Sequence, residues 1–129
     1  MHSSRQHKDG WATTLAAIGV MLSATLQAAV IVPDLAAELV LRAPQDEIAV
    51  IASLSDKVDL RLFKLEDRSK RDTRLVKALK EKAAATQGTH RVFLQNQGAQ
   101  QIRELWVINA IAVTARVSVI RQLASRPGI

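Results

Sequence analysis

Three short stretches of the chain, 47–54, 102–109 and 110–115, either alternate apolar and polar residues or are apolar throughout. This pattern predicts three β-strands. Both faces of the first stretch are largely apolar, so we expect it to lie inside a sheet rather than at a solvated edge. Asn109 separates the other two strands. Because asparagine tolerates a left-handed backbone, we expect a tight reversal or a bulge there.

Apolar residues at helical spacing predict helices on either side of these strands. Residues 32–43 predict a leading helix and residues 116–126 a final one. Asp59 can cap a short helix over 60–66 with its acceptor oxygens. The inward faces of the leading and final helices are expected to carry Leu35, Leu39, Val40, Val117, Ile120, Leu123 and Ala124.

The middle of the chain predicts two further helices, over 67–87 and 90–97. Gly88 is placed as the C-terminal cap of the first, and Thr89 as the N-cap of the second. Gly98 should end the second helix. The residues expected to face inward are Leu75, Val76, Leu79, Ala83, Val92 and Phe93.

The first residues have the pattern of an export signal. A polar leader with Arg5 and Lys8 precedes 22 uncharged residues, from Trp11 to Val32. This order predicts a secretory signal peptide cut after Ala28, and hence a secreted or periplasmic protein. Two alternatives stay open: an uncut run long enough to anchor the chain in a membrane, and a buried core helix.

The net charge of +6 invites a nucleic-acid or anionic-surface partner. Export argues against nucleic acid, so we expect none. Between residues 67 and 82 acidic and basic side chains are interleaved, as on a solvated helix face. The same face is also compatible with an acidic partner.

The sequence shows no catalytic constellation. It has no cysteine, no Gly-x-Ser-x-Gly elbow and no glycine-rich phosphate loop. His90 is the one histidine after the leader, and we interpret it as a solvated residue near a helix start. A single histidine does not form a metal cluster. We therefore expect no enzymatic activity, no metal and no cofactor.

The predicted elements follow the order strand, helices, strand, strand, helix after the leading helix. A fourth strand would complete a split βαβ fold of the ferredoxin-like kind, which is an α+β fold. In this sequence that strand should begin at Ile129, the final residue. We therefore expect the last strand to be missing.

The stretch "LWVINAIAVTARVSVIRQLASRPGI" resembles the propeptide (inhibitor) domain of bacterial subtilisin-like serine proteases, the subtilases. The resemblance is good from Glu104 to Gly128 and weaker over "VPDLAAELV" and "EIAVIASL". Over the helical middle, residues 56–100, the resemblance lies in the general character of the sequence and not in a motif. It implies a signal peptide over 1–28, a leading helix over 29–45 and a propeptide-like inhibitor domain over 46–129 that is incomplete at its C-terminus. The implied fold is ferredoxin-like, with an extra N-terminal helix and a helical insert.

In that family the domain speeds folding of its protease as an intramolecular chaperone and then inhibits it. The resemblance implies a subtilisin-like serine protease as the partner, with the open face of the sheet against the protease and the tail in the substrate cleft. Carried over to this chain, the protease interface consists of Trp106, Ile108, Ala112 and Thr114. The cleft-directed tail consists of Pro127, Gly128 and Ile129. The residues that would face the helices are Leu105, Val107, Ile111 and Val113.

The sequence departs from the family in lacking the last strand and the protease domain with its Asp, His and Ser motifs. We therefore expect weak inhibition or none by this chain, unless a partner supplies the missing strand. The alternative interpretation is an exported or membrane-anchored interaction module without catalysis, which binds through its basic helical face. A membrane is a partner only if the leader is uncleaved.

Overall fold

The computed structural model describes residues 30–65 and 67–129, which form an α+β structure. The predicted signal peptide over 1–28 lies outside the described residues, so the predicted division of the chain stays a prediction. The elements are α1 (Pro33–Leu41), β1 (Glu47–Ser53), the 3₁₀ helix η1 (Leu60–Phe63), α2 (Arg68–Asn96), β2 (Gln100–Leu105), β3 (Ala110–Arg116) and α3 (Val117–Ala124).

The three strands form one antiparallel sheet in the order β1-β3-β2. β3 is central and pairs with β1 in a continuous register, which sets Ile48 opposite Ala115 and Ala52 opposite Ile111. Among the described strands β1 therefore lies at an edge, and the prediction that it lies inside the sheet is wrong. The second apolar face of β1 is not buried, since Ile51 is 64% exposed on the side away from the helices.

The connection between β2 and β3 is a turn over residues 106–109, so the strand predicted over 102–109 is wrong in extent. The expected reversal at Asn109 is confirmed, because this residue has a left-handed φ of 46°. A second irregularity lies within β2, where the register shifts between Gln100 and Arg103 and Gln101 has a φ of 51°. β2 therefore begins two residues earlier than predicted and contains a bulge.

The middle of the chain is one continuous helix, α2, of 29 residues. The prediction of two helices divided at Gly88 and Thr89 is wrong, because residues on both sides of the glycine pack against the sheet and keep the helix in register. The predicted end at Gly98 is confirmed by its φ of 72°. Ala99 N–H donates to the carbonyl of Leu94 and Gly98 N–H to that of Gln95, each at 3.0 Å, which is the Schellman pattern.

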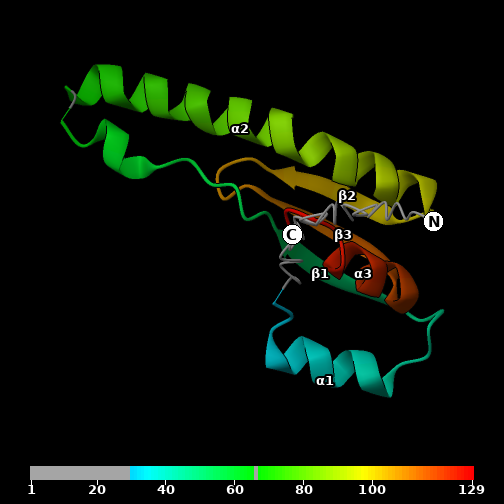
Figure 1. Cartoon of the computed structure of the whole chain (residues 1–129). Coiled ribbons are helices and arrows are strands. Elements are labelled where there is room, and N and C mark those ends of the chain that lie inside the picture. The colour runs from blue at the N-terminus through cyan, green and yellow to red at the C-terminus, as the bar shows by residue number, and fades with distance from the viewer. Residues whose placement is uncertain (1–29, 66) are drawn as a thin grey trace, which may run out of the picture.

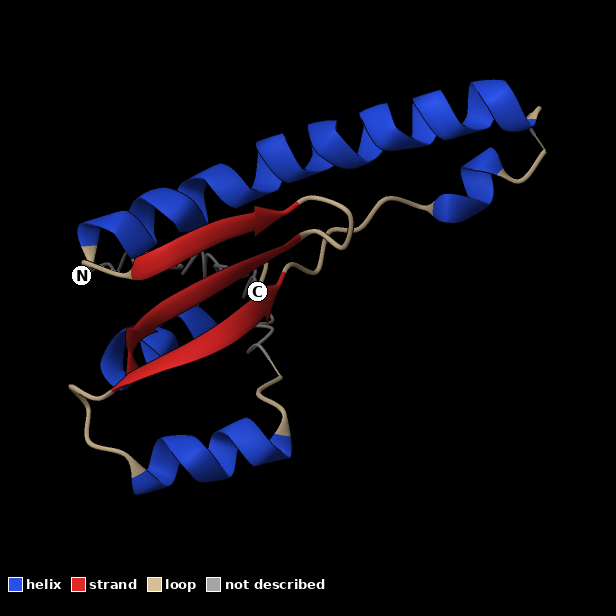
Figure 2. Cartoon of the chain, turned by 180° about the vertical axis from the view of Figure 1, so that it is seen from behind, coloured by secondary structure: helices blue, strands red, loops and turns tan. Residues whose placement is uncertain are grey.

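Helices α2 and α3 cover one face of the sheet (Figure 1). Seen from behind, none of the described helices lies in front of the strands (Figure 2). α1 lies beyond β1 and contributes Leu39 to the core, while the guanidinium of Arg121 on α3 donates to the Leu39 carbonyl at 2.7 Å. The core consists of Leu39, Ile48, Ala52, Leu54, Leu94, Ile111, Val113, Ala115, Val117, Val119, Ile120 and Leu123.

Most residues of the helices that were predicted to face inward are buried or half-buried, but the prediction is wrong for three valines. Val40 is 77% exposed, Val92 50% and Val76 40%. Each valine stands beside a residue that takes the inward position instead, as Leu39 does beside Val40. The capping role predicted for Asp59 is confirmed, since its carboxylate accepts from the N–H of Arg61 at 3.0 Å.

Candidate functional site

The open face of the sheet is the surface that the predicted interface was meant to occupy. Strand alternation places on it Ala49 and Ile51 of β1, Ala112 and Thr114 of β3, and Arg103 of β2. They surround a shallow hollow of about 490 Å³. Small side chains line the middle of this face, so a partner's side chains can approach the backbone of the sheet closely. Two of the four predicted interface residues, Ala112 and Thr114, lie here and are half-buried.

The other two predicted interface residues, Trp106 and Ile108, lie in the turn after β2. The ammonium of Lys80 on α2 stands 5.3 Å from the centre of the Trp106 ring. Ile108 is 53% exposed and, together with Trp106 and Leu79, lines a separate hollow of about 380 Å³ at the end of the sheet. The prediction that all four share one face is therefore wrong, because the strand ends before Trp106.

The facing predicted for Ile111 and Val113 is confirmed, since both are buried under the helices. Leu105 lies on the face of the sheet opposite to the predicted one. It shares the face of Arg103, whereas Glu104 between them points to the helix side, where its carboxylate lies 3.1 Å from the guanidinium of Arg91 on α2. Val107, also predicted to face the helices, is 58% exposed in the turn. The bulge near Gln101 sets this alternation of β2.

The side chain of Asn109 joins the turn to the rest of the fold through a group of hydrogen bonds, which we call the Asn109 clasp. This side chain is 3% exposed, and its amide donates to the carbonyl of Asp56 at 2.6 Å. Its Oδ1 accepts from Nε2 of Gln87 at 2.9 Å, and Thr86 Oγ1 lies 3.0 Å from Nδ2. The sequence identified Asn109 as a turn residue but gave no sign of this network, whose partners are 22 or more positions away.

Lys57 fixes the same turn from the other side. Its ammonium donates to Ser53 Oγ at 2.8 Å, to the Asn109 carbonyl at 3.1 Å and to the carbonyl of Ile108. Burial lowers the pKa of Lys57 from its ordinary value. An ammonium has three donors, and these three acceptors use them all. Lys57 therefore serves the fold.

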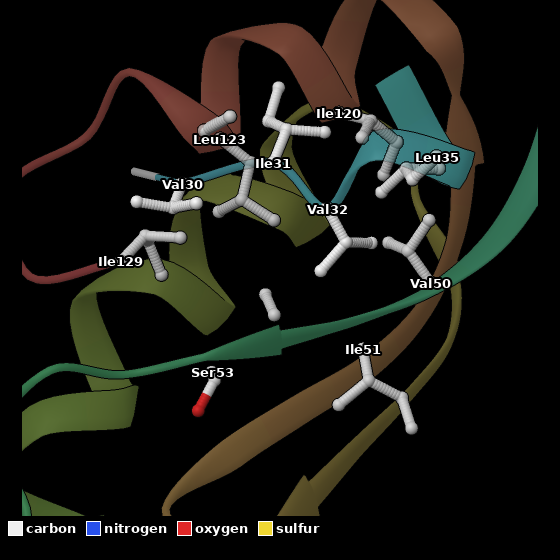
Figure 3. A pocket seen from close by; sticks show the side chains of 12 residues that line it. Val30, Ile31, Val32, Leu35, Val50, Ile51, Ser53, Ile120, Leu123 and Ile129 are labelled. Carbon is white, nitrogen blue, oxygen red and sulfur yellow. The ribbon is translucent and has the colours of Figure 1, made fainter. Parts of the chain in front are cut away.

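The predicted cleft-directed tail lies at the end of β1. The carbonyl of Gly128 accepts from the N–H of Ser55 at 2.8 Å, and Gly128 has a left-handed φ of 88°. Ile129 packs against the core and faces a cavity of about 210 Å³ between β1, α3 and residues 30–32 (Figure 3). In the isolated chain the tail is thus seated on its own domain. That it enters a protease cleft stays a prediction.

The prediction that His90 is a solvated residue near a helix start is wrong. His90 lies in the middle of α2, is 5% exposed, and its Nδ1 accepts from the guanidinium Nε of Arg126 at 3.3 Å. Arg126 also lies over the ring of Phe93, 4.4 Å from its centre. Burial, and then the charge of Arg126, lower the pKa of His90 from its ordinary value.

A spacing signal for His90 was present in the sequence. The buried residues of α2, namely Ala83, Gln87, His90 and Leu94, are three or four positions apart and form a single stripe. Dividing the helix at Gly88 concealed it. His90 therefore belongs to the contact between α2 and the C-terminal residues.

Among the residues that the structure describes, no group of three or more His, Asp or Glu side chains could hold a metal ion. No helix in the same part of the chain has the length and apolar character needed to cross a membrane. Comparison with protein-family models, with curated proteins and with solved structures found no match for this chain.

Proposed function

We propose that this chain is a subtilase propeptide-like domain, an intramolecular chaperone and inhibitor of a subtilisin-like serine protease. The observation that carries the proposal is the one-sided sheet. Helices α2 and α3 cover one face, and the other presents Ala112, Thr114 and the exposed Ile51. A sheet with a single covering layer leaves a second face that a partner can bury.

The order of the elements supports a ferredoxin-like fold. The order β1-β3-β2, with α2 between β1 and β2 and with α3 after β3, is that of three strands of a split βαβ sandwich. The bond between Gly128 and Ser55 brings the tail to the end of β1, and Ile129 lines a cavity beside the free edge of this strand. A strand there would pair antiparallel with β1, as the fourth strand of this fold does.

The tail offers the second proposed contact. An extended tail inhibits a protease by adding as a strand to the substrate-binding edge. Here the tail would first have to leave its position beside Ser55, which costs the 2.8 Å backbone hydrogen bond and the packing of Ile129. This cost leads us to expect weak inhibition. Export of the chain, which rests on the sequence alone, would place it with such a protease.

The test measures inhibition of a mature subtilase by the full chain, together with the refolding yield of the denatured protease. We expect micromolar inhibition and a faster recovery of protease activity. Ala112→Arg should abolish both effects, because it places a charged chain in the middle of the open face. Ala84→Arg is the matched control, since Ala84 is exposed on α2. Absence of both effects in the parent chain, or equal effects of the two variants, would overturn the proposal.

A further inference from the structure

One part of the molecule extends away from the sheet. We define the arm as residues 59–65 and 67–82, which include η1 and the N-terminal half of α2. Figures 1 and 2 both show this half of the helix running beyond the strands, with η1 as its neighbour. Phe63 is buried between them, and Ala78 lines the same contact. The arm is therefore two helical segments thick and projects into solvent.

The arm exposes large apolar side chains. Leu65 is 100% exposed, Leu62 73% and Leu60 58%, all within six residues of chain. Single exposed leucines are ordinary, but a group of them on one projection marks a surface that binds something. Leaving three leucines in water forgoes the favourable free energy that their burial would contribute.

The arm also carries most of the excess positive charge. Between residues 59 and 82 the sequence has nine Lys and Arg against five Asp and Glu, which accounts for four of the six net charges of the chain. Several ion pairs form locally, including Arg61 with Asp59 and Lys77 with Glu81. Each such pair removes one charge of either sign, so the basic surplus remains.

We propose that the arm docks on an anionic lipid surface. Leu60, Leu62 and Leu65 would enter the boundary between headgroups and acyl chains, and the lysines and arginines of α2 would reach the phosphates. Apolar residues bordered by basic ones are the signature of interfacial membrane binding, and each basic residue near an anionic surface strengthens the attraction. Long basic side chains extend their charge past an apolar contact.

A lipid surface fits the arm better than an acidic protein does. Leu62 and Leu65 stand out from a narrow projection, and a rigid protein would need a matching hollow to bury them. A bilayer deforms around such a tip. The charge of the arm selects anionic over neutral lipid. This inference goes beyond protease inhibition, and the arm shares no residue with the open face of the sheet, so either proposal can fail alone.

The test uses the full chain and co-sedimentation with vesicles of phosphatidylcholine alone or with about 30% phosphatidylglycerol. We expect at least about tenfold tighter binding to the anionic vesicles, weakening as NaCl is raised from about 50 to about 300 mM. Leu60→Ser/Leu62→Ser/Leu65→Ser should reduce anionic-vesicle binding at least about tenfold. Arg68→Glu/Lys70→Glu should do so as well. All five residues are exposed, so circular dichroism should show an intact fold.

The matched control is Arg42→Glu/Arg103→Glu, which makes the same change of charge outside the arm and should keep most of the binding. The N-terminal apolar run is present in every variant, so binding through it would be equal in all of them, and that result overturns the proposal. Equal loss in the control and the arm variants would reduce the effect to net charge and overturn it too. Binding of polyglutamate, with no preference between the vesicles, would assign the arm to an acidic protein instead.

Discussion

The two halves of helix α2 have the same backbone geometry but different surroundings. The C-terminal half buries Ala83, Gln87, His90 and Leu94 against the sheet and the C-terminal residues. The N-terminal half packs mainly against η1, with further contacts from Lys80 to the Trp106 ring and from Lys82 to Asp56. Its inward residues Leu75 and Leu79 are half-buried. A helix can thus be continuous while its stabilisation is concentrated in one half. We infer that the buried half holds the fold together and that the exposed half is free to bind a partner.

The largest difference between the halves is expected in the free energy of unfolding that a leucine-to-alanine substitution removes in each. Leu94→Ala should lower the free energy of unfolding by about 2–5 kcal/mol, because Leu94 is 0% exposed and its loss leaves a cavity. Leu75→Ala, in the arm, should cost about 1 kcal/mol or less, since its half-buried side chain loses less contact. Urea unfolding followed by circular dichroism gives both values. Equal losses would mean that the arm is as tightly packed as the rest.

The Asn109 clasp joins the buried half of α2 to the turn. Its loss should cause the next largest fall in the free energy of unfolding. Asn109→Ala should cost about 2–4 kcal/mol, because Gln87 and the Asp56 carbonyl lose their partner and alanine is strained at a φ of 46°. Asn109→Gly removes the strain and keeps the loss of the side chain. Denaturant unfolding of both variants separates the two contributions. If the glycine variant matched the parent chain, the hydrogen bonds would contribute nothing.

The sequence could predict the parts of the fold that follow from local pattern. Alternation located β1 and β3, Asp59 and Gly98 marked helix ends, and Asn109 marked the left-handed turn. The continuity of α2 through Gly88 could not be predicted, because Gln87 and His90 look like surface residues until the sheet beneath them is known. The edge position of β1 depends on strand pairing, and pairing is not a local property.

The candidate site was predictable to the same extent. The facing of Ala112 and Thr114 followed from the period of β3 alone, because this strand is regular and its alternate residues are buried. Trp106 and Ile108 were misplaced because the end of β2 depends on the Asn109 clasp, which involves residues far away in sequence. The arm was predicted as a short helix over 60–66 followed by a charged helix, and not as a projecting apolar surface. Its exposed leucines lie in η1 and in the turn after it, a stretch of six residues that is too short to show a face.

The smallest expected effect is a pH dependence confined to the buried half. His90 has a pKa below its ordinary value, so the unfolded chain binds its proton more readily than the folded one. The stability that neutral His90 contributes is complete above the ordinary histidine pKa of about 6.5, and it is lost as the pH falls from there through the lowered pKa of the folded state. The positive charge of Arg126 beside the ring also opposes protonation of the imidazole.

This dependence should appear as a fall in the free energy of unfolding between about pH 7.5 and about pH 5, measured by urea titration at each pH. His90→Gln removes the titrating group and should flatten the curve over this range. Leu75→Ala, in the arm, should leave its shape unchanged and only shift it downward. A curve of the same slope in the His90→Gln variant would place the titrating group elsewhere. The contact between α2 and Arg126 would then not distinguish the two halves of the helix.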